Sequence, residues 1–134
     1  MSELTYINYE GAGQKNSDEC HYSQAVILGD IVKASGQGGW DDAGDVKADA
    51  KGQVDLAFEN VDKALRAVGL RGWEDVFSVR SYHRDIDATF PIVVEKLKQR
   101  IPGHRPTWTS IQVARLAFPA MEIEIEVEAY RGKK

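Results

Sequence analysis

Alternation of apolar and acidic residues is the clearest pattern in the chain. Between Met121 and Tyr130 every second residue is apolar, and the positions between them hold four glutamates: Glu122, Glu124, Glu126 and Glu128. Successive side chains of a strand point to opposite faces, so this pattern predicts a strand with one apolar and one acidic face. A strand from Thr107 to Leu116 is predicted before it, separated from it by a short connection.

A helical period is clearest between Val46 and Val68. The apolar residues of this segment recur three and four positions apart: Val54, Ala57, Phe58, Val61, Ala64, Leu65 and Val68. This spacing places them along one side of a helix. Asp45 or Asp49 is the candidate N-cap, and Gly69 stands where helices commonly end in glycine.

A second helix is predicted from Ala88 to Arg100. Its apolar side consists of Phe90, Val93, Val94, Leu97 and Ile101. Asp87 is its candidate N-cap, and Pro91 is tolerated in a first turn. The Pro102-Gly103 pair ends the helix.

Shorter runs rich in β-branched and aromatic residues predict the remaining strands. These strands are Leu4–Tyr9, Ser23–Leu28, Ile31–Ser35 and Val76–His83. Gly29-Asp30 joins the second and third of them as a hairpin turn. Residues 36–45, rich in glycine and aspartate, are expected to form a loop.

The order of these elements predicts the fold class. The order β-β-β-α-β-α-β-β is typical of an α+β sandwich, in which both helices cover one face of a single sheet. At 134 residues the chain is expected to form one domain, residues 1–134. Two helices supply apolar cover for only one face, so the other face must meet water, a ligand or another subunit.

The face on which Trp108 lies affects any functional interpretation. If Ile111 and Val113 face the helices, strand alternation places Trp108 and Ser110 on the opposite face. Hairpin pairing with the final strand would then set Trp108 beside the glutamates, at an interface or a pocket rim. The acidic face is itself typical of an oligomer contact, but Glu124, at mid-strand, is the candidate for a buried functional group.

Composition and charge restrict the classes of partner and the cellular location that can be expected. The net charge of −4 provides no basic field for a phosphate backbone, which disfavours nucleic acid. No apolar run approaches the ~20 residues of a membrane span, and the first residues do not resemble a signal peptide. Cys20 is the only cysteine, which is typical of a reducing compartment, so a cytoplasmic location is predicted.

No metal or cofactor motif is recognisable. The three histidines, His21, His83 and His104, are too widely spaced to form a metal-ligand pattern with Cys20 and are expected to be structural or at the surface. The glycines near Trp40 do not open a helix as a dinucleotide-binding motif would, and no phosphate-binding loop is present. The sequence therefore predicts neither a cofactor nor a metal.

Three segments, taken together, carry a family resemblance. They are HYSQAVILGDIVKASGQGG, AFENVDKALRAVGL with the following WEDVFSVRSYHRD, and IQVARL with MEIEIEVEAY. The chain in this way resembles the YjgF/Rid family of reactive-intermediate (enamine and imine) deaminases, also known as endoribonuclease L-PSP-like proteins. The resemblance runs from about residue 20 to 130. It implies a chorismate-mutase-like α+β fold and a homotrimer that binds small molecules in clefts between subunits.

The resemblance also implies site residues. The tyrosine of the family's P-Y-S-Q stretch falls on Tyr22, and its S-G-Q turn falls on Ser35, Gly36 and Gln37. The glutamate of its I-E-I-E strand falls on Glu124, which in the family positions an attacking water. Glu124 is therefore the expected catalytic residue, and the other four are expected to bind substrate.

The sequence departs from the family where a carboxylate-binding arginine is expected. The family's P-x-R-[ST]-[CS] register falls on residues 106–110, which places Trp108 at the arginine and Ser110 at the usual cysteine. An indole offers one neutral donor in place of a charged two-pronged group. Losing that group should cost an amino-acid-derived imine at least about tenfold in affinity. Arg105, three residues upstream, is a candidate substitute.

Two functional interpretations therefore stay open. The chain could be a hydrolase of C=N bonds, with specificity altered towards larger, neutral or aromatic substrates by Trp108. It could instead be a non-catalytic trimer that binds a small molecule or acts in regulation. A ribonuclease function is the weakest interpretation, because the acidic face would repel RNA.

Overall fold

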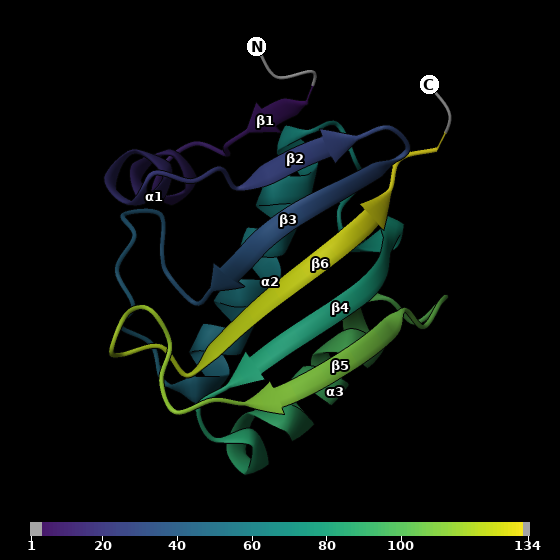
Figure 1. The fold of residues 1–134 in the computed structure, drawn as a ribbon. Helices are drawn as coiled ribbons and strands as arrows, with labels where there is room; N and C mark the ends of the chain where they lie inside the picture. The colour runs from purple at the N-terminus through teal and green to yellow at the C-terminus, as the bar shows by residue number, and fades with distance from the viewer. Residues whose placement is uncertain (1–3, 133–134) are drawn as a thin grey trace.

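A six-stranded sheet with two long helices packed against one side forms the body of the protein (Figure 1). The structure, a computed structural model, describes residues 4–132. In chain order the elements are β1 (Thr5–Ile7), α1 (Ala12–Cys20), β2 (Ala25–Leu28), β3 (Ile31–Gly38), α2 (Ala50–Ala67), a single 3-10 turn (Trp73–Asp75), β4 (Val76–His83), α3 (Ile86–Arg100), β5 (Thr107–Gln112) and β6 (Ile123–Tyr130). The predicted α+β fold, with α2 and α3 on one face of the sheet, is confirmed.

The strands lie in the order β1-β2-β3-β6-β4-β5. Neighbours are antiparallel except for β4 and β5, which run parallel. A parallel pair needs a long crossover, and α3 supplies it between β4 and β5. β5 consequently forms one edge of the sheet, and β6 lies near its centre.

The core lies between the sheet and α2. Residues from both layers are at most 2% exposed: Val32, Val54, Phe58, Val61, Val79, Ile125 and Val127. Each such side chain stabilises the fold by roughly 1.5–3 kcal/mol relative to leaving it in water. The apolar positions of β6 and the predicted stripe of α2 are the two halves of this core.

α2 begins at Ala50, later than the predicted Val46. Of the two candidate caps, Asp49 is the one used, because its side chain accepts a hydrogen bond of 2.8 Å from the Gly52 amide. Gly69 follows the helix with φ +86°, a conformation that residues with a Cβ rarely adopt.

α3 begins two residues earlier than predicted, at Ile86. Its N-cap is Asp85 and not Asp87, since the Asp85 side chain accepts a long hydrogen bond, 3.4 Å, from the Ala88 amide. Pro91 consequently lies in the second turn of the helix.

α1 was not predicted. It is short and polar, and only Ala12, Gly13 and Asn16 are buried, so it has no apolar stripe to show in the sequence. His21 ends the helix in the left-handed conformation, with φ 60°.

The strand boundaries differ from prediction at several ends. β1, β2 and β6 are shorter than predicted, and β4 matches its prediction. β3 runs on to Gly38 instead of ending at Ser35, because it continues along β6 beyond a bulge between Ala34 and Gln37. The first residues of the predicted loop therefore belong to the sheet.

The prediction for β5 was wrong in both its length and its partner. The strand ends at Gln112, and it pairs with β4, not with β6. In this register Trp108 stands beside Val79, which is buried beneath the helices, and Ile111 stands beside Tyr82. Trp108 therefore faces the helices, the opposite of the predicted orientation.

Burial explains the orientation of β5. The Trp108 ring stacks on Phe90 of α3, with ring centroids 4.8 Å apart and 10° between the planes. Ile111, on the other face, is left 45% exposed. The larger apolar area of the tryptophan outweighs that of the isoleucine.

Candidate functional site

Glu124 lies in the middle of β6, on the face of the sheet that has no helices. The bulge in β3 brings Gly36 against it, and a Cβ at Gly36 would lie 2.5 Å from Cδ of Glu124. No side chain larger than hydrogen fits there without displacing the carboxylate. The glycine predicted from the family motif is thus required by close packing on Glu124.

The Glu124 carboxylate has no hydrogen-bond or ion-pair partner among residues 4–132. Its side chain is half-buried, and burial raises the pKa of Glu124 above its ordinary value, with the charge of Glu126 adding to the rise. A carboxylate with a raised pKa and free oxygens can accept a proton from water more readily than an ordinary one.

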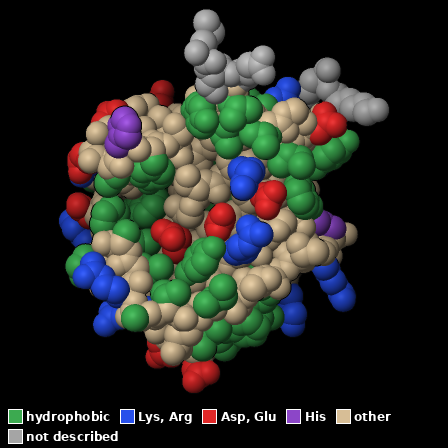
Figure 2. All heavy atoms as spheres, in the orientation of Figure 1, with side chains coloured by type: hydrophobic (Ala, Val, Ile, Leu, Met, Phe, Trp, Pro, Cys, Tyr) green, Lys and Arg blue, Asp and Glu red, His purple; other side chains and the backbone are tan. Residues whose placement is uncertain are grey.

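The acids nearer the end of β6 are engaged with side chains of β4. Arg80 Nη1 lies 3.9 Å from Glu126 and 3.7 Å from Glu128, and the Tyr82 hydroxyl donates to Glu126 at 2.6 Å. That hydrogen bond raises the pKa of Tyr82 to about 12. Figure 2 shows acidic and basic side chains together at the centre of this face, with apolar side chains around them.

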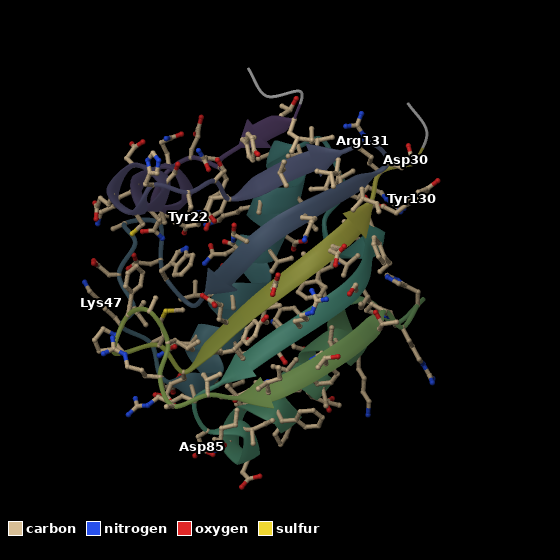
Figure 3. All side chains as sticks on the ribbon, viewed as in Figure 1. Tyr22, Asp30, Lys47, Asp85, Tyr130 and Arg131 are labelled. Carbon is tan, nitrogen blue, oxygen red and sulfur yellow. The ribbon has the colours of Figure 1, made fainter. Side chains whose placement is uncertain are left out.

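Tyr22, labelled in Figure 3, ends a chain of largely buried hydrogen bonds, and the charge of Glu124 acts on its hydroxyl. Trp40 Nε1 donates to the Tyr9 hydroxyl at 2.9 Å, and Tyr9 donates to Gln37 at 2.8 Å. Gln37 then donates to Gln24 at 2.7 Å, and Gln24 donates to the Tyr22 hydroxyl at 3.0 Å. This chain holds the Tyr22 hydroxyl in place, and burial raises its pKa.

A hollow of about 360 Å³ opens next to these residues. Its polar lining comes from β1, β3, β6 and the segment before β2: Tyr6, Tyr22, Ser23, Lys33, Ser35 and Glu126. Ser35 donates to the Ser23 carbonyl at 2.7 Å, which fixes the edge of the hollow. Gln37 is fully buried and does not line the hollow, because its side chain is held by Tyr9 and Gln24.

Trp108 and Ser110 lie on the other face, in a second polar cluster. Trp108 Nε1 donates to Ser81 Oγ at 2.8 Å, and Ser81 donates to Ser110 Oγ at 3.1 Å. Ser110 Oγ is 2.7 Å from His83 Nε2, while His83 Nδ1 is 2.6 Å from Thr89 Oγ1. The structure therefore does not bring Trp108 and Ser110 to Glu124 within one chain.

Hydrogen bonding assigns the tautomer of His83. Thr89 Oγ1 donates to the Asp85 carbonyl at 3.1 Å, so it accepts from His83 Nδ1–H, which leaves Nε2 to accept from Ser110. His83 is fully buried, and burial lowers its pKa, so the neutral ring is favoured. The sequence allowed His83 a structural role, and this cluster is that role.

Arg105 lies with Trp108 along a groove of about 610 Å³ beside α3. The predicted site residues thus fall into two sets on opposite faces of the sheet. Glu124, Tyr22 and Ser35 belong to the first set, together with the glycine and glutamine of the bulge; Arg105, Trp108 and Ser110 form the second.

Several residues of these clusters were missed by sequence reasoning. Tyr9 and Gln24 hold the first set together, and Ser81 and Thr89 the second. No spacing in the sequence links them, because their contacts cross between strands and helices far apart in the chain. Gln24 alone among them had a local signal, as the glutamine of the Tyr22-Ser23-Gln24 stretch.

Two further findings concern the whole described chain. Between residues 4 and 132, no group of three or more His, Cys, Asp or Glu side chains is arranged to hold a metal ion. In the same range, no helix has both the length and the apolar character needed to cross a membrane.

The fold, together with a half-buried glutamate packed against a bulge of the sheet, defines a class of protein. Comparison with known proteins identifies that class. A family model described as Endoribonuclease L-PSP matches residues 14–131. The chain belongs to this family, the YjgF/Rid family.

Individual relatives support the same assignment. The chain is 34% identical over 110 residues to the RutC family protein YjgH of Escherichia coli K12, covering 80% of this chain and 82% of that protein. A solved structure of protein YjgH superposes with a TM-score of 0.88 at 29% identity, over 99% of this chain and 100% of the other. The structure of E. coli TdcF with bound serine has a TM-score of 0.73 at 32% identity, covering 83% and 88%.

Proposed function

We propose that the protein hydrolyses C=N bonds of imine or enamine intermediates, with Glu124 as the catalytic residue. One observation carries the proposal: the Glu124 carboxylate is half-buried, packed on Gly36 and without a hydrogen-bond partner in the described chain. Membership of the YjgF/Rid family supports it, because the resemblance assigns water activation to this position.

The reaction needs one group that accepts and returns a proton. Glu124 takes a proton from water while the oxygen attacks the carbon of the protonated imine, and the C=N electron pair moves to the nitrogen. Glu124 then returns this proton to the amino nitrogen of the resulting carbinolamine. The C–N bond breaks with its electron pair on the nitrogen, and the hydroxyl proton passes to the departing ammonia, so that a carbonyl compound and ammonium leave. An enamine enters after protonation of its β-carbon.

The residues around Glu124 would hold the substrate. The Tyr22 hydroxyl, fixed by its hydrogen-bond chain, has one hydrogen left to donate to a substrate acceptor. Backbone groups of Ser35, Gly36 and Gln37 line the bulge next to the carboxylate. A rigid donor at this place lowers the entropy cost of orienting the substrate.

We further propose a homotrimer in which the site is completed by a neighbouring subunit. β5 is an edge strand that carries Trp108 and Ser110, and Arg105 lies on the segment that leads into it. In the proposed trimer this edge of one copy would meet the Glu124 face of the next. The three residues would then bind the part of the substrate remote from the C=N bond.

The test is an imine generated in situ by an amino-acid oxidase or a threonine dehydratase. Decay of the intermediate is followed in its absorbance, with ammonia measured as product. The proposal predicts decay faster than the buffer background, and faster for aromatic than for small aliphatic imines. No acceleration with any imine would contradict it.

A second function, small-molecule binding without turnover, is favoured by the position of Trp108. Its ring stacks on Phe90 and its N–H is engaged by Ser81, so it supplies no cationic partner for a substrate carboxylate. Trp108→Arg distinguishes the two functions. If this variant gains deaminase activity that the natural protein lacks, the remaining site is competent and only the clamp is missing. If both are inactive and the natural protein binds a small molecule, binding without turnover is the function.

A further inference from the structure

The groove beside α3 differs in chemistry and in place from the hollow lined by Tyr22, Ser35 and Glu126. It lies between α3 and the segment that leads into β5, on the helix side of the sheet, and it encloses about 610 Å³. Its walls are mainly apolar: Val94, Leu97, Ile101, Pro102, Pro106 and Trp108. A mostly apolar groove of this size is typical of sites for small organic ligands.

The polar groups of the groove all carry or can carry positive charge. They are Lys98, His104 and Arg105, and no acidic residue is among those that line it. Within residues 4–132, neither Lys98 nor Arg105 has an ion-pair partner, whereas the other cation of this helix end, Arg100, is held by Glu74 and Asp62. The two free cations therefore have no counter-charge from the protein.

The two cations are not equivalent. Lys98 lies in the last turn of α3, where its charge already offsets the negative end of the helix dipole. Arg105 lies beyond the helix, on a segment steadied by His104, whose Nε2 is 2.8 Å from the Val76 carbonyl and donates to it. A planar guanidinium can bind a carboxylate through two parallel hydrogen bonds, which makes Arg105 the main partner.

We infer that this groove is a binding site for a small amphipathic carboxylate. Its apolar body, aromatic or aliphatic, lies against Trp108 and Leu97, and its carboxylate is bound by Arg105 with support from Lys98. The site shares Trp108 and Arg105 with the proposed trimeric cleft, but the inference does not require that Glu124 hydrolyse anything. The inference places the carboxylate-binding group of this chain at Arg105, beside the position that Trp108 occupies.

The probe is 2-naphthoate, compared with its neutral isostere 2-naphthamide, with dissociation constants measured by calorimetry on the full chain. Naphthoate is expected to bind at least about tenfold more tightly than the amide, since a charge-assisted bond is at stake. The location is read from indole N–H NMR signals. Trp40 and Trp73 are 2% and 0% exposed, so the Trp108 signal alone is expected to shift.

Variants decide which charge acts. Arg105→Gln is expected to weaken naphthoate binding about tenfold and amide binding hardly at all, and Lys98→Gln to weaken naphthoate by a smaller factor. Lys47→Gln removes an exposed charge from the segment before α2 (Figure 3), outside the groove lining, and is expected to change neither. Val94→Trp, which fills the groove, should abolish binding of both probes while the folded circular-dichroism spectrum is retained.

Four results would overturn the inference: no binding at millimolar probe, equal affinity for the acid and the amide, equal losses in Arg105→Gln and Lys47→Gln, or no shift of the Trp108 signal. Hydrolysis is measured as release of ammonia, and occupancy of the groove is measured as equilibrium binding. Failure of the hydrolysis assay would therefore leave this site standing, and failure of the binding assay would leave Glu124 as the proposed catalytic residue.

Discussion

At the scale of single residues, the contact between Gly36 and Glu124 is the feature on which the proposed chemistry depends. The glycine lets the bulge of β3 reach the carboxylate, and the carboxylate is left with free oxygens and a raised pKa. Neither property is visible from Glu124 alone in the sequence, where it is one of four alternating glutamates. Packing against the bulge is what separates it from the other three.

Adding one methyl group at the bulge tests this contact. In Gly36→Ala the new Cβ would lie 2.5 Å from Glu124 Cδ, so the carboxylate must move. A displacement of about 1 Å is expected to lower imine hydrolysis on the order of a hundredfold. Gly103→Ala is the matched control, because nothing lies within 4 Å of the place that its methyl group would occupy, and its rate should be unchanged. Equal rates in the two variants would remove the contact from the mechanism.

The raised pKa of Glu124 also has a consequence for stability. A carboxyl whose folded-state pKa is raised destabilises the protein at pH values above that pKa, and the penalty disappears below the unfolded value of 4.5. Glu124→Gln should therefore unfold at a higher temperature than the natural protein at pH 7, with the difference shrinking to nothing near pH 4. Thermal unfolding of both proteins between pH 4 and pH 7 measures the difference in unfolding temperature. A variant less stable than the natural protein at pH 7 would show that burial of the Glu124 charge does not destabilise the fold.

At the scale of elements, the connection of β4, α3 and β5 decides where Trp108 lies. The periods of α2 and β6 predicted these two elements because many residues repeat one pattern. In β5 the alternation allows two orientations, one that turns Ile111 and Val113 to the helices and one that turns Trp108 to them. The parallel pairing with β4 and the Phe90 contact decide the orientation, and both come from parts of the chain that local pattern does not reach.

His83, which joins these elements, is expected to make stability depend on pH. Its pKa is lowered by burial, so between that value and the ordinary 6.5 the unfolded chain binds more protons than the folded one. Stability due to His83 is therefore complete above pH 6.5 and is lost as pH falls towards the folded pKa. Denaturant unfolding at pH 7.5 and 5.5 should show a larger loss for the natural protein than for His83→Gln. An equal loss in both would contradict the neutral assignment.

At the scale of the whole molecule, half of the sheet surface lacks cover from the described chain. The helices cover one face, as the sequence predicted from the number of apolar stripes. The other face exposes Leu28, Ile111 and Tyr130 by 42%, 45% and 52%, around the charged centre. The trimer is a proposal. The hydrophobic pattern and the composition indicate that this face needs a partner, but they do not specify the symmetry of the assembly.

Charge placed on this rim tests the assembly. In the proposed trimer Ile111→Arg introduces an unpaired charge into the contact, so a species of three 14.9-kDa chains is expected to shift towards one. Glu59→Arg, on the exposed side of α2, is the control and should leave the mass unchanged. Light scattering after gel filtration gives the masses. A single-chain mass for the natural protein would contradict the trimer outright.

The most direct test of the central claim is the rate of imine hydrolysis in Glu124→Gln. Glutamine keeps the shape of the side chain and removes its ability to accept a proton, so the rate should fall at least about a hundredfold and its rise with pH should disappear. Glu128→Gln alters an acid of the same strand that is paired with Arg80, and it should keep the natural rate and pH profile. Hydrolysis that survives in Glu124→Gln with its pH dependence intact would contradict the account.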